Sequence, residues 1–201
     1  MITAIDPKSA LILIDLQKGI LKNETAHPIE QVIMHANLLI SSFRKAGLPI
    51  VFVTVDPFAM PLRNARVEKP MVAQSKLFRG VQKLGARITG FKKLHPDLRS
   101  EPGDLYLTKH TWNAFFETDL HSELLGFGTT NIVLGGISTS VGVEGTARAA
   151  SELGYNLTFP IDAMTDQVGP SHDNSVKNIF PKLGETGIAA DVVRLLPRNS
   201  A

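Results

Sequence analysis

Hydrophobic positions along the chain form two kinds of pattern, short continuous runs and longer stretches with helical spacing. The continuous runs have the length of buried strands and lie at 10–14, 48–55, 105–108, 132–134 and 157–161. The longer stretches repeat apolar residues every three or four positions, as a helix with one buried face does, and lie at 28–46, 117–125, 143–153 and 171–183. The segment 187–190 leads to a last short strand, and a helix is expected from Asp191.

Strands and helices therefore alternate along the chain. This alternation predicts an α/β fold, a three-layer α/β/α sandwich around a parallel sheet. The first strand, the helix after it and the second strand are expected to form a right-handed crossover. Because 201 residues suit one core and no linker or internal repeat divides them, residues 1–201 are predicted to be a single domain.

The least regular part of the chain follows the second predicted strand, from Asp56 to about residue 80. Connections of this length inside a compact domain are often lids or binding loops. Two of its arginines, Arg63 and Arg66, are candidates to hold a substrate carboxylate. The alternative is that both are solvated surface residues. The next segment, 81–98, fits either a short helix followed by a loop or a loop alone.

Composition excludes several classes of function. The chain has no cysteine, which rules out disulfides, thiolate metal sites and thiol nucleophiles. The net charge is only +2 and no run of lysines or arginines occurs, so a nucleic-acid partner is not expected. Apolar runs are far shorter than the ~20 residues of a membrane span, and the first ten residues lack the pattern of a signal peptide. We therefore expect a cytoplasmic protein that does not bind membranes.

Two charged residues directly follow predicted strands. Asp15 comes after the run 10–14, and Lys109 comes after the run 105–108. Open α/β folds bind ligands at the carboxyl ends of their strands, so both side chains are candidates for a functional site. The alternatives are that Asp15 caps a turn or pairs with a nearby cation, and that Lys109 is a solvated loop residue.

A strand, tight turn and helix are predicted across 131–155. After the strand come two glycines and three hydroxyl residues, Ser138, Thr139 and Ser140, and Gly154 ends the helix. Backbone N–H groups at such a helix start suit an oxyanion or a carboxylate. For any one hydroxyl the expected role is that of an N-cap, although capping alone does not explain the whole turn.

This stretch resembles the nucleophile turn of the isochorismatase-like hydrolases, also called the cysteine hydrolase family. The matching positions are Gly136, Ile137, Thr139, Val143, Thr146, Ala147, Arg148, Gly154 and Tyr155. Gly142 stands at the position of the family's catalytic cysteine, which identifies the chain as a member of a subgroup with glycine in place of the nucleophile.

Other segments extend the resemblance over nearly the whole chain. They are Ile14, Asp15 and Gln17; Lys109 with Asn113, Ala114 and Phe115; and the run Asp162 to Asp166. The resemblance implies a sheet of about six strands in the order 3-2-1-4-5-6, with a cis peptide bond at Ile137–Ser138. It also implies that Asp15 is the general acid or base and that Lys109 is the second catalytic residue.

The resemblance also implies the surroundings of the site. Substrate-binding candidates are Asp56, Arg63, Arg66, Trp112, Ile137, Ser138 and Thr139, with Trp112 forming a wall. In the nicotinamidases, which are metal-dependent relatives, an aspartate and histidines bind a metal, and Asp56 falls on that aspartate. Phe58 stands where the first histidine would be. Because a lone carboxylate makes a poor transition-metal site, we expect no metal and no other cofactor.

Three functions remain open without the cysteine. True isochorismatases also carry glycine at this position and cleave a vinyl ether. The resemblance therefore implies acid-assisted hydrolysis in which a protonated Asp15 delivers a proton and Lys109, with one arginine, holds a carboxylate. True isochorismatases have glutamine where this chain has Asp56, which is a departure that bears on the substrate.

The second possibility is an amidase that uses a Ser or Thr hydroxyl as its nucleophile. The third is a catalytically inactive protein that binds a small molecule or a partner protein. For an enzyme of either kind, the expected partner is a small-molecule substrate. Relatives usually form homodimers or larger homo-oligomers, in which the loop 57–72 could cover a neighbour's pocket.

Overall fold

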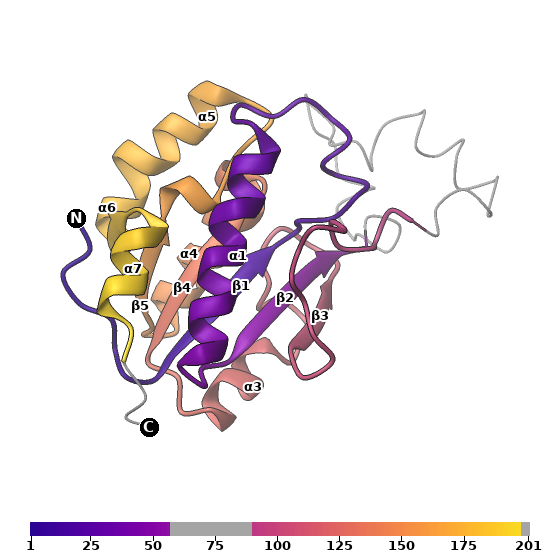
Figure 1. Ribbon diagram of the computed structural model, residues 1–201. Helices are drawn as coiled ribbons and strands as arrows, with labels where there is room; N and C mark the ends of the chain where they lie inside the picture. Colours follow the sequence, from indigo (N-terminus) through magenta and orange to yellow (C-terminus); the bar gives the residue numbers. More distant parts are fainter. Residues whose placement is uncertain (57–89, 198–201) are drawn as a thin grey trace.

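The computed structural model describes residues 1–56 and 90–197. Its sheet has six parallel strands in the order β3-β2-β1-β4-β5-β6 (Figure 1). The strands are β1 Ser9–Ile14, β2 Ile50–Val55, β3 Leu105–Lys109, β4 Asn131–Gly136, β5 Asn156–Pro160 and β6 Glu185–Gly187. The predicted α/β architecture and strand order are confirmed.

Helices cover both faces of the sheet. Their bounds are α1 Ile29–Lys45, α3 Leu120–Gly126, α4 Glu144–Glu152, α5 Gly169–Asn174, α6 Phe180–Leu183 and α7 Ala189–Leu195. Three segments have a wider or tighter helical turn, and these are η3 Thr139–Val143, η4 Ile161–Ala163 and η5 Ser175–Ile179. Within the described residues, none of these helices combines the length and hydropathy that a membrane crossing requires.

The central strand β1 explains the three layers. All six of its residues are buried, and successive side chains in a strand point to opposite faces. Leu11 and Leu13 pack in the core that contains α1 and α7. Ile12 and Ile14 pack in the second core, with α3, α4 and α6. A strand that is covered on both faces is a continuous apolar run, as the sequence pattern indicated.

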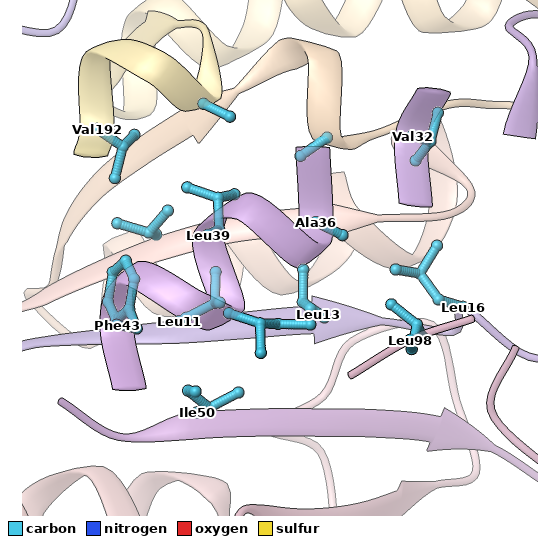
Figure 2. Close-up of a cluster of buried hydrophobic side chains, with 14 of the residues drawn as sticks. Leu11, Leu13, Leu16, Val32, Ala36, Leu39, Phe43, Ile50, Leu98 and Val192 are labelled. Atoms are coloured by element: carbon cyan, nitrogen blue, oxygen red, sulfur yellow. The ribbon is translucent and has the colours of Figure 1, made fainter. Parts of the chain in front are cut away.

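Helix α1 buries one stripe against β1 and β2. Val32, Ala36, Leu39 and Phe43 recur at spacings of three and four and are nearly inaccessible to solvent. Figure 2 shows these side chains directed toward Leu11, Leu13 and Ile50 of the sheet, with Val192 of α7 beside them. Burial of one such side chain contributes about 1.5–3 kcal/mol, so this layer holds β1 firmly in place.

Some predicted boundaries are wrong near the C-terminus. The last strand is Glu185–Gly187 and precedes the expected segment 187–190, and α7 begins at Ala189 and not at Asp191. The reason is a close approach at Gly184, where a Cβ would lie 2.2 Å from the Leu157 carbonyl oxygen. Because the chain already lies against β5 at Gly184, it enters the sheet directly after α6, which ends at Leu183 as predicted.

The candidate site lies where β1 and β4 end side by side. Ile14 pairs with Gly136, and Gly136 has a φ of +120°, which only glycine adopts readily. A Cβ at Gly136 would lie 2.1 Å from the Ile14 carbonyl oxygen. Glycine at this position thus lets β4 come close enough to place its turn beside the end of β1.

We expect Gly136→Ala to lower the free energy of unfolding by at least about 2–4 kcal/mol, because it adds both backbone strain and overpacking. Gly103→Ala is the matched control, since nothing lies within 4 Å of a Cβ there, and it should change stability by less than about 0.5 kcal/mol. Urea unfolding followed by circular dichroism measures both. Equal stability of the two variants would contradict the close approach.

Candidate active site

Asp15 occupies the turn at the carboxyl end of β1. Its φ is +54°, a left-handed conformation that is uncommon for a residue with a side chain. Its main-chain N–H donates to the Val53 carbonyl at 2.8 Å, and its own carbonyl accepts from the Gln17 N–H at 2.6 Å. The residue is only 5% exposed. The turn therefore directs a carboxyl group into a space that water scarcely reaches.

Lys109 comes from the end of β3, and its side chain meets Asp15 although β2 lies between their strands. Its Nζ donates to Asp15 Oδ2 at 2.7 Å and to the Thr111 carbonyl at 3.1 Å. Lys109 is 2% exposed. The two residues that the sequence placed at separate strand ends thus form one buried ion pair.

Burial dominates the electrostatics of Asp15. Desolvation raises the pKa of its carboxyl group, and the charge and hydrogen bond of Lys109 lower it by less. Within the described part of the chain, Asp15 Oδ1 has no hydrogen-bond partner although it is buried. Since such atoms are nearly always paired in proteins, the free oxygen is where a proton or a ligand would be accommodated.

Gly142 lies in η3, directly beside this pair. A Cβ at this position would be 2.9 Å from Ile14 Cγ2 and 3.2 Å from Asp15 Oδ2. The residue is buried. A side chain at the position of the family's nucleophile would therefore crowd both Ile14 and the carboxyl group of Asp15, and glycine avoids this contact.

The hydroxyl residues at this helix start do not act as the expected N-cap. The Ile137–Ser138 peptide bond is cis, as predicted, and Ser138 makes no side-chain capping bond. Asp166 takes that role from another segment, because its Oδ2 accepts the Ser140 N–H at 2.7 Å and the Ser140 hydroxyl at 2.8 Å. The expectation of a Ser or Thr N-cap is wrong because a longer-range carboxylate fills the position.

Thr139 connects this turn to His172. The Thr139 hydroxyl donates to the Thr165 carbonyl at 2.9 Å, so it accepts its second bond, also 2.9 Å, from Nδ1 of His172. Burial lowers the pKa of His172, and His27 adds to the effect. No spacing in the sequence could have indicated this contact, because the partners are 33 residues apart.

Other predicted site residues lie around the pair and differ in their contacts and in their exposure to solvent. The Asp56 N–H donates to the Lys109 carbonyl at 2.9 Å, and its side chain forms an ion pair with Lys92, which the sequence analysis did not single out. Trp112 is 49% exposed and lies against the start of α4. A Cβ added at Gly145 would be 3.5 Å from the Cβ of Trp112. Ile137 is fully buried.

Two further predictions concern carboxylate binding and metal binding. Arg63 and Arg66, the candidates for carboxylate binding, lie outside the residues that the structure describes, as does Phe58. In residues 1–56 and 90–197, no three side chains of the kinds that bind metals gather closely enough to hold an ion.

Comparisons with known proteins agree on one family. The family model described as "Isochorismatase domain" matches residues 9–191. The chain is 36% identical over 183 residues to the uncharacterized isochorismatase family protein YwoC of Bacillus subtilis, covering 89% of each. It is 30% identical over 181 residues to the ureidoacrylate amidohydrolase RutB of Pantoea ananatis, covering 81% of this chain and 71% of that protein. An isochorismatase family protein from Burkholderia thailandensis superposes with a TM-score of 0.85 at 32% identity, covering 98% of this chain and 99% of the other.

A cysteine introduced at Gly142 should report on the site. We expect the thiol of Gly142→Cys to have a pKa at least about one unit below the usual ~8.5, because the helix start and the Lys109 ammonium favour a thiolate. The pH dependence of alkylation by iodoacetamide measures this, and the absence of native cysteine makes the label unique. Gly103→Cys, on the surface, is the control. Equal reactivity of the two thiols would show that the pocket lacks the described geometry.

Proposed function

This chain belongs to the isochorismatase family of hydrolases, and we propose that it hydrolyses a small carboxylate-bearing substrate by acid assistance, without a cysteine nucleophile. The observation that carries the proposal is the buried pair in which Lys109 holds Asp15 Oδ2 at 2.7 Å and leaves Oδ1 without a partner among the described residues. A carboxyl group with a raised pKa is suited to donate a proton.

The reaction class is hydrolysis of a vinyl ether. The acid form of Asp15 gives its proton to the terminal carbon of the double bond, which leaves an oxocarbenium ion. Water adds to the oxocarbenium carbon and loses a proton, and the carbon–oxygen bond then breaks to release an alcohol and a carbonyl product. Asp15 recovers a proton in the process. Lys109 stabilises the carboxylate form of Asp15 after transfer, because its ammonium group remains hydrogen-bonded to Oδ2.

Gly142 supports this mechanism because it adds no side chain beside Asp15. The position beside Asp15 Oδ2 and Ile14 Cγ2 is too tight for an added side chain unless a neighbour moves. A side chain at residue 142 would compete with a substrate for the approach to Asp15. Glycine therefore suits a reaction in which the carboxyl group itself meets the substrate.

An amidase that uses a hydroxyl nucleophile is the second candidate, favoured by the name of the RutB relative. Two of the three hydroxyls are poorly placed for that role. Thr139 is fully buried and gives its proton to a carbonyl oxygen, and the Ser140 hydroxyl is bound to Asp166. A nucleophile needs its proton taken by a base, and these hydrogen bonds argue against that step.

The proposal also covers the assembly. We treat residues 1–201 as one catalytic domain of a cytoplasmic homodimer or larger homo-oligomer that acts on a free small molecule. Asp56 and Trp112 border the substrate, and Arg63 or Arg66 binds its carboxylate together with Lys109.

The direct test is to incubate the protein with isochorismate and follow the release of pyruvate. We expect turnover that falls by about 10²–10⁴-fold in Asp15→Asn, which cannot donate the proton, and also falls in Lys109→Ala. Asp97→Asn and Lys177→Ala are matched controls, since both side chains are largely exposed, and they should retain activity.

Failure on isochorismate and on a panel of small vinyl ethers and amides would favour a binding protein. Thermal-shift screening with small carboxylates then discriminates, because a ligand that binds only the folded state still raises the melting temperature.

The pH dependence should show which protonation state is active. Because burial raises the pKa of Asp15 above 3.8 and the acid form donates the proton, kcat/KM should be highest below that raised pKa. It should fall by about tenfold per pH unit above it. Steady-state rates over a wide pH range measure the profile. A profile that instead rises with pH through this ionisation would assign Asp15 as a base and contradict the proposed step.

A further inference from the structure

The hydrogen-bond ladder between β1 and β2 ends in an unusual way at the candidate site. The two strands pair in regular register from Leu11 with Ile50 to Ile14 with Val53. The next rung is also regular, since the Asp15 N–H donates to the Val53 carbonyl at 2.8 Å. In a parallel ladder the following bonds would run from the Val55 N–H to the Asp15 carbonyl and from the Gln17 N–H to the Val55 carbonyl.

Those two bonds are replaced. The Gln17 N–H instead donates to the Asp15 carbonyl at 2.6 Å, so the two main-chain groups of the first strand that would face Val55 bind each other. This short turn accompanies the left-handed conformation of Asp15. Without a substitute, the N–H and the carbonyl of Val55 would both lack partners in a region closed to solvent, which is strongly disfavoured.

The side chain of Gln17 supplies both missing partners. Its Oε1 accepts from the Val55 N–H at 2.7 Å, and its Nε2 donates to the Val55 carbonyl at 3.2 Å. Gln17 is completely buried. Its amide thus acts in place of a peptide group, with one acceptor and one donor at the correct spacing. The same Nε2 lies 3.4 Å from the Phe91 carbonyl, which links the segment after residue 90 to this edge.

From this arrangement we infer that Gln17 is the positioning residue of the active site: its side-chain amide completes the sheet so that the main chain can turn at Asp15 and present the carboxyl group to Lys109. Gln17 acts through Asp15, and the arrangement assigns it no contact with substrate. The inference rests on the proposed function for its effect on catalysis, but its effect on the conformation of Asp15 is independent of turnover.

Gln17→Glu is the sharpest variant, because glutamate has the same shape but loses the donor and places negative charge beside two carbonyl oxygens. We expect kcat on isochorismate to fall by about 10²-fold, as misplacement of a reacting group by 1 Å can cause, with KM changed by less than about threefold. The exposed Gln31 of α1 provides the control, since Gln31→Glu adds the same charge elsewhere and should leave both constants unchanged.

A second readout separates positioning from stability and from the proposed function. Titration of the Asp15 carboxyl carbon by ¹³C NMR, assigned by its absence in Asp15→Asn, should give a raised pKa in the wild type. In Gln17→Met, which removes both hydrogen-bonding groups without adding a charge, that pKa should move toward 3.8, because a released turn exposes the carboxyl group to water. A merely structural role would lower the melting temperature and leave this titration unmoved.

Hydrogen exchange in the wild type keeps the inference testable even if the variant does not fold. The Val55 amide should exchange as slowly as the amides inside β2, because Gln17 protects it. Rapid exchange of Val55, or an unchanged Asp15 titration in Gln17→Met together with an unchanged kcat in Gln17→Glu, would overturn the inference. If the wild type turns over no substrate but the Asp15 titration moves as described, the proposed function fails and the positioning role stands.

Discussion

The buried ion pair between Asp15 and Lys109 is the interaction on which the rest of the site depends. Two charges removed from water are costly, and loss of one partner from such a pair typically costs about 3–5 kcal/mol. Here the side chains of Asp15 and Lys109 are 7% and 2% exposed and join at 2.7 Å. The pair holds together only because β1, β2 and β3 end at the same edge of one parallel sheet.

Several irregular features of the backbone lie around this pair. Asp15 leaves β1 in a left-handed conformation, and Gly136 comes against the Ile14 carbonyl where only glycine fits. Gly142 lies where a Cβ would crowd both Ile14 and the carboxyl group. Each feature is unfavourable or unusual by itself, and together they bring one carboxyl group and one ammonium group into contact beside a residue without a side chain. Such clustering of special backbone positions is characteristic of functional sites.

The architecture was predictable because its cause is local. Buried strands are continuous apolar runs, and α1 shows its buried stripe by spacing alone. The position of Asp15 and Lys109 after two such runs was also visible. Their direct contact was not, because it depends on strand order and on a lysine reaching across β2, which only the family resemblance implied. Order and contact follow from three-dimensional packing that periodicity does not encode.

Contacts between distant polar groups were the hardest to anticipate. The capping of the helix start by Asp166, the bond between Thr139 and His172, and the pairing of Lys92 with Asp56 join residues 26, 33 and 36 positions apart. Several of these residues lie in recognised motifs, but the motifs do not state which distant residue each one contacts. The role of Gln17 shows the same limit, since its motif position was recognised but the substitution of a side chain for two ladder bonds is visible only in the fold.

A crystal structure of the protein soaked with pyruvate, the product of the proposed reaction, would show whether Asp15 meets the substrate. We expect the ligand to lie over Gly142 with an oxygen within hydrogen-bond distance of Asp15 Oδ1, while Lys109 keeps its bond to Oδ2. A structure in which Oδ1 is bound to another protein group that fills this space, with no ligand beside the ion pair, would contradict this expectation.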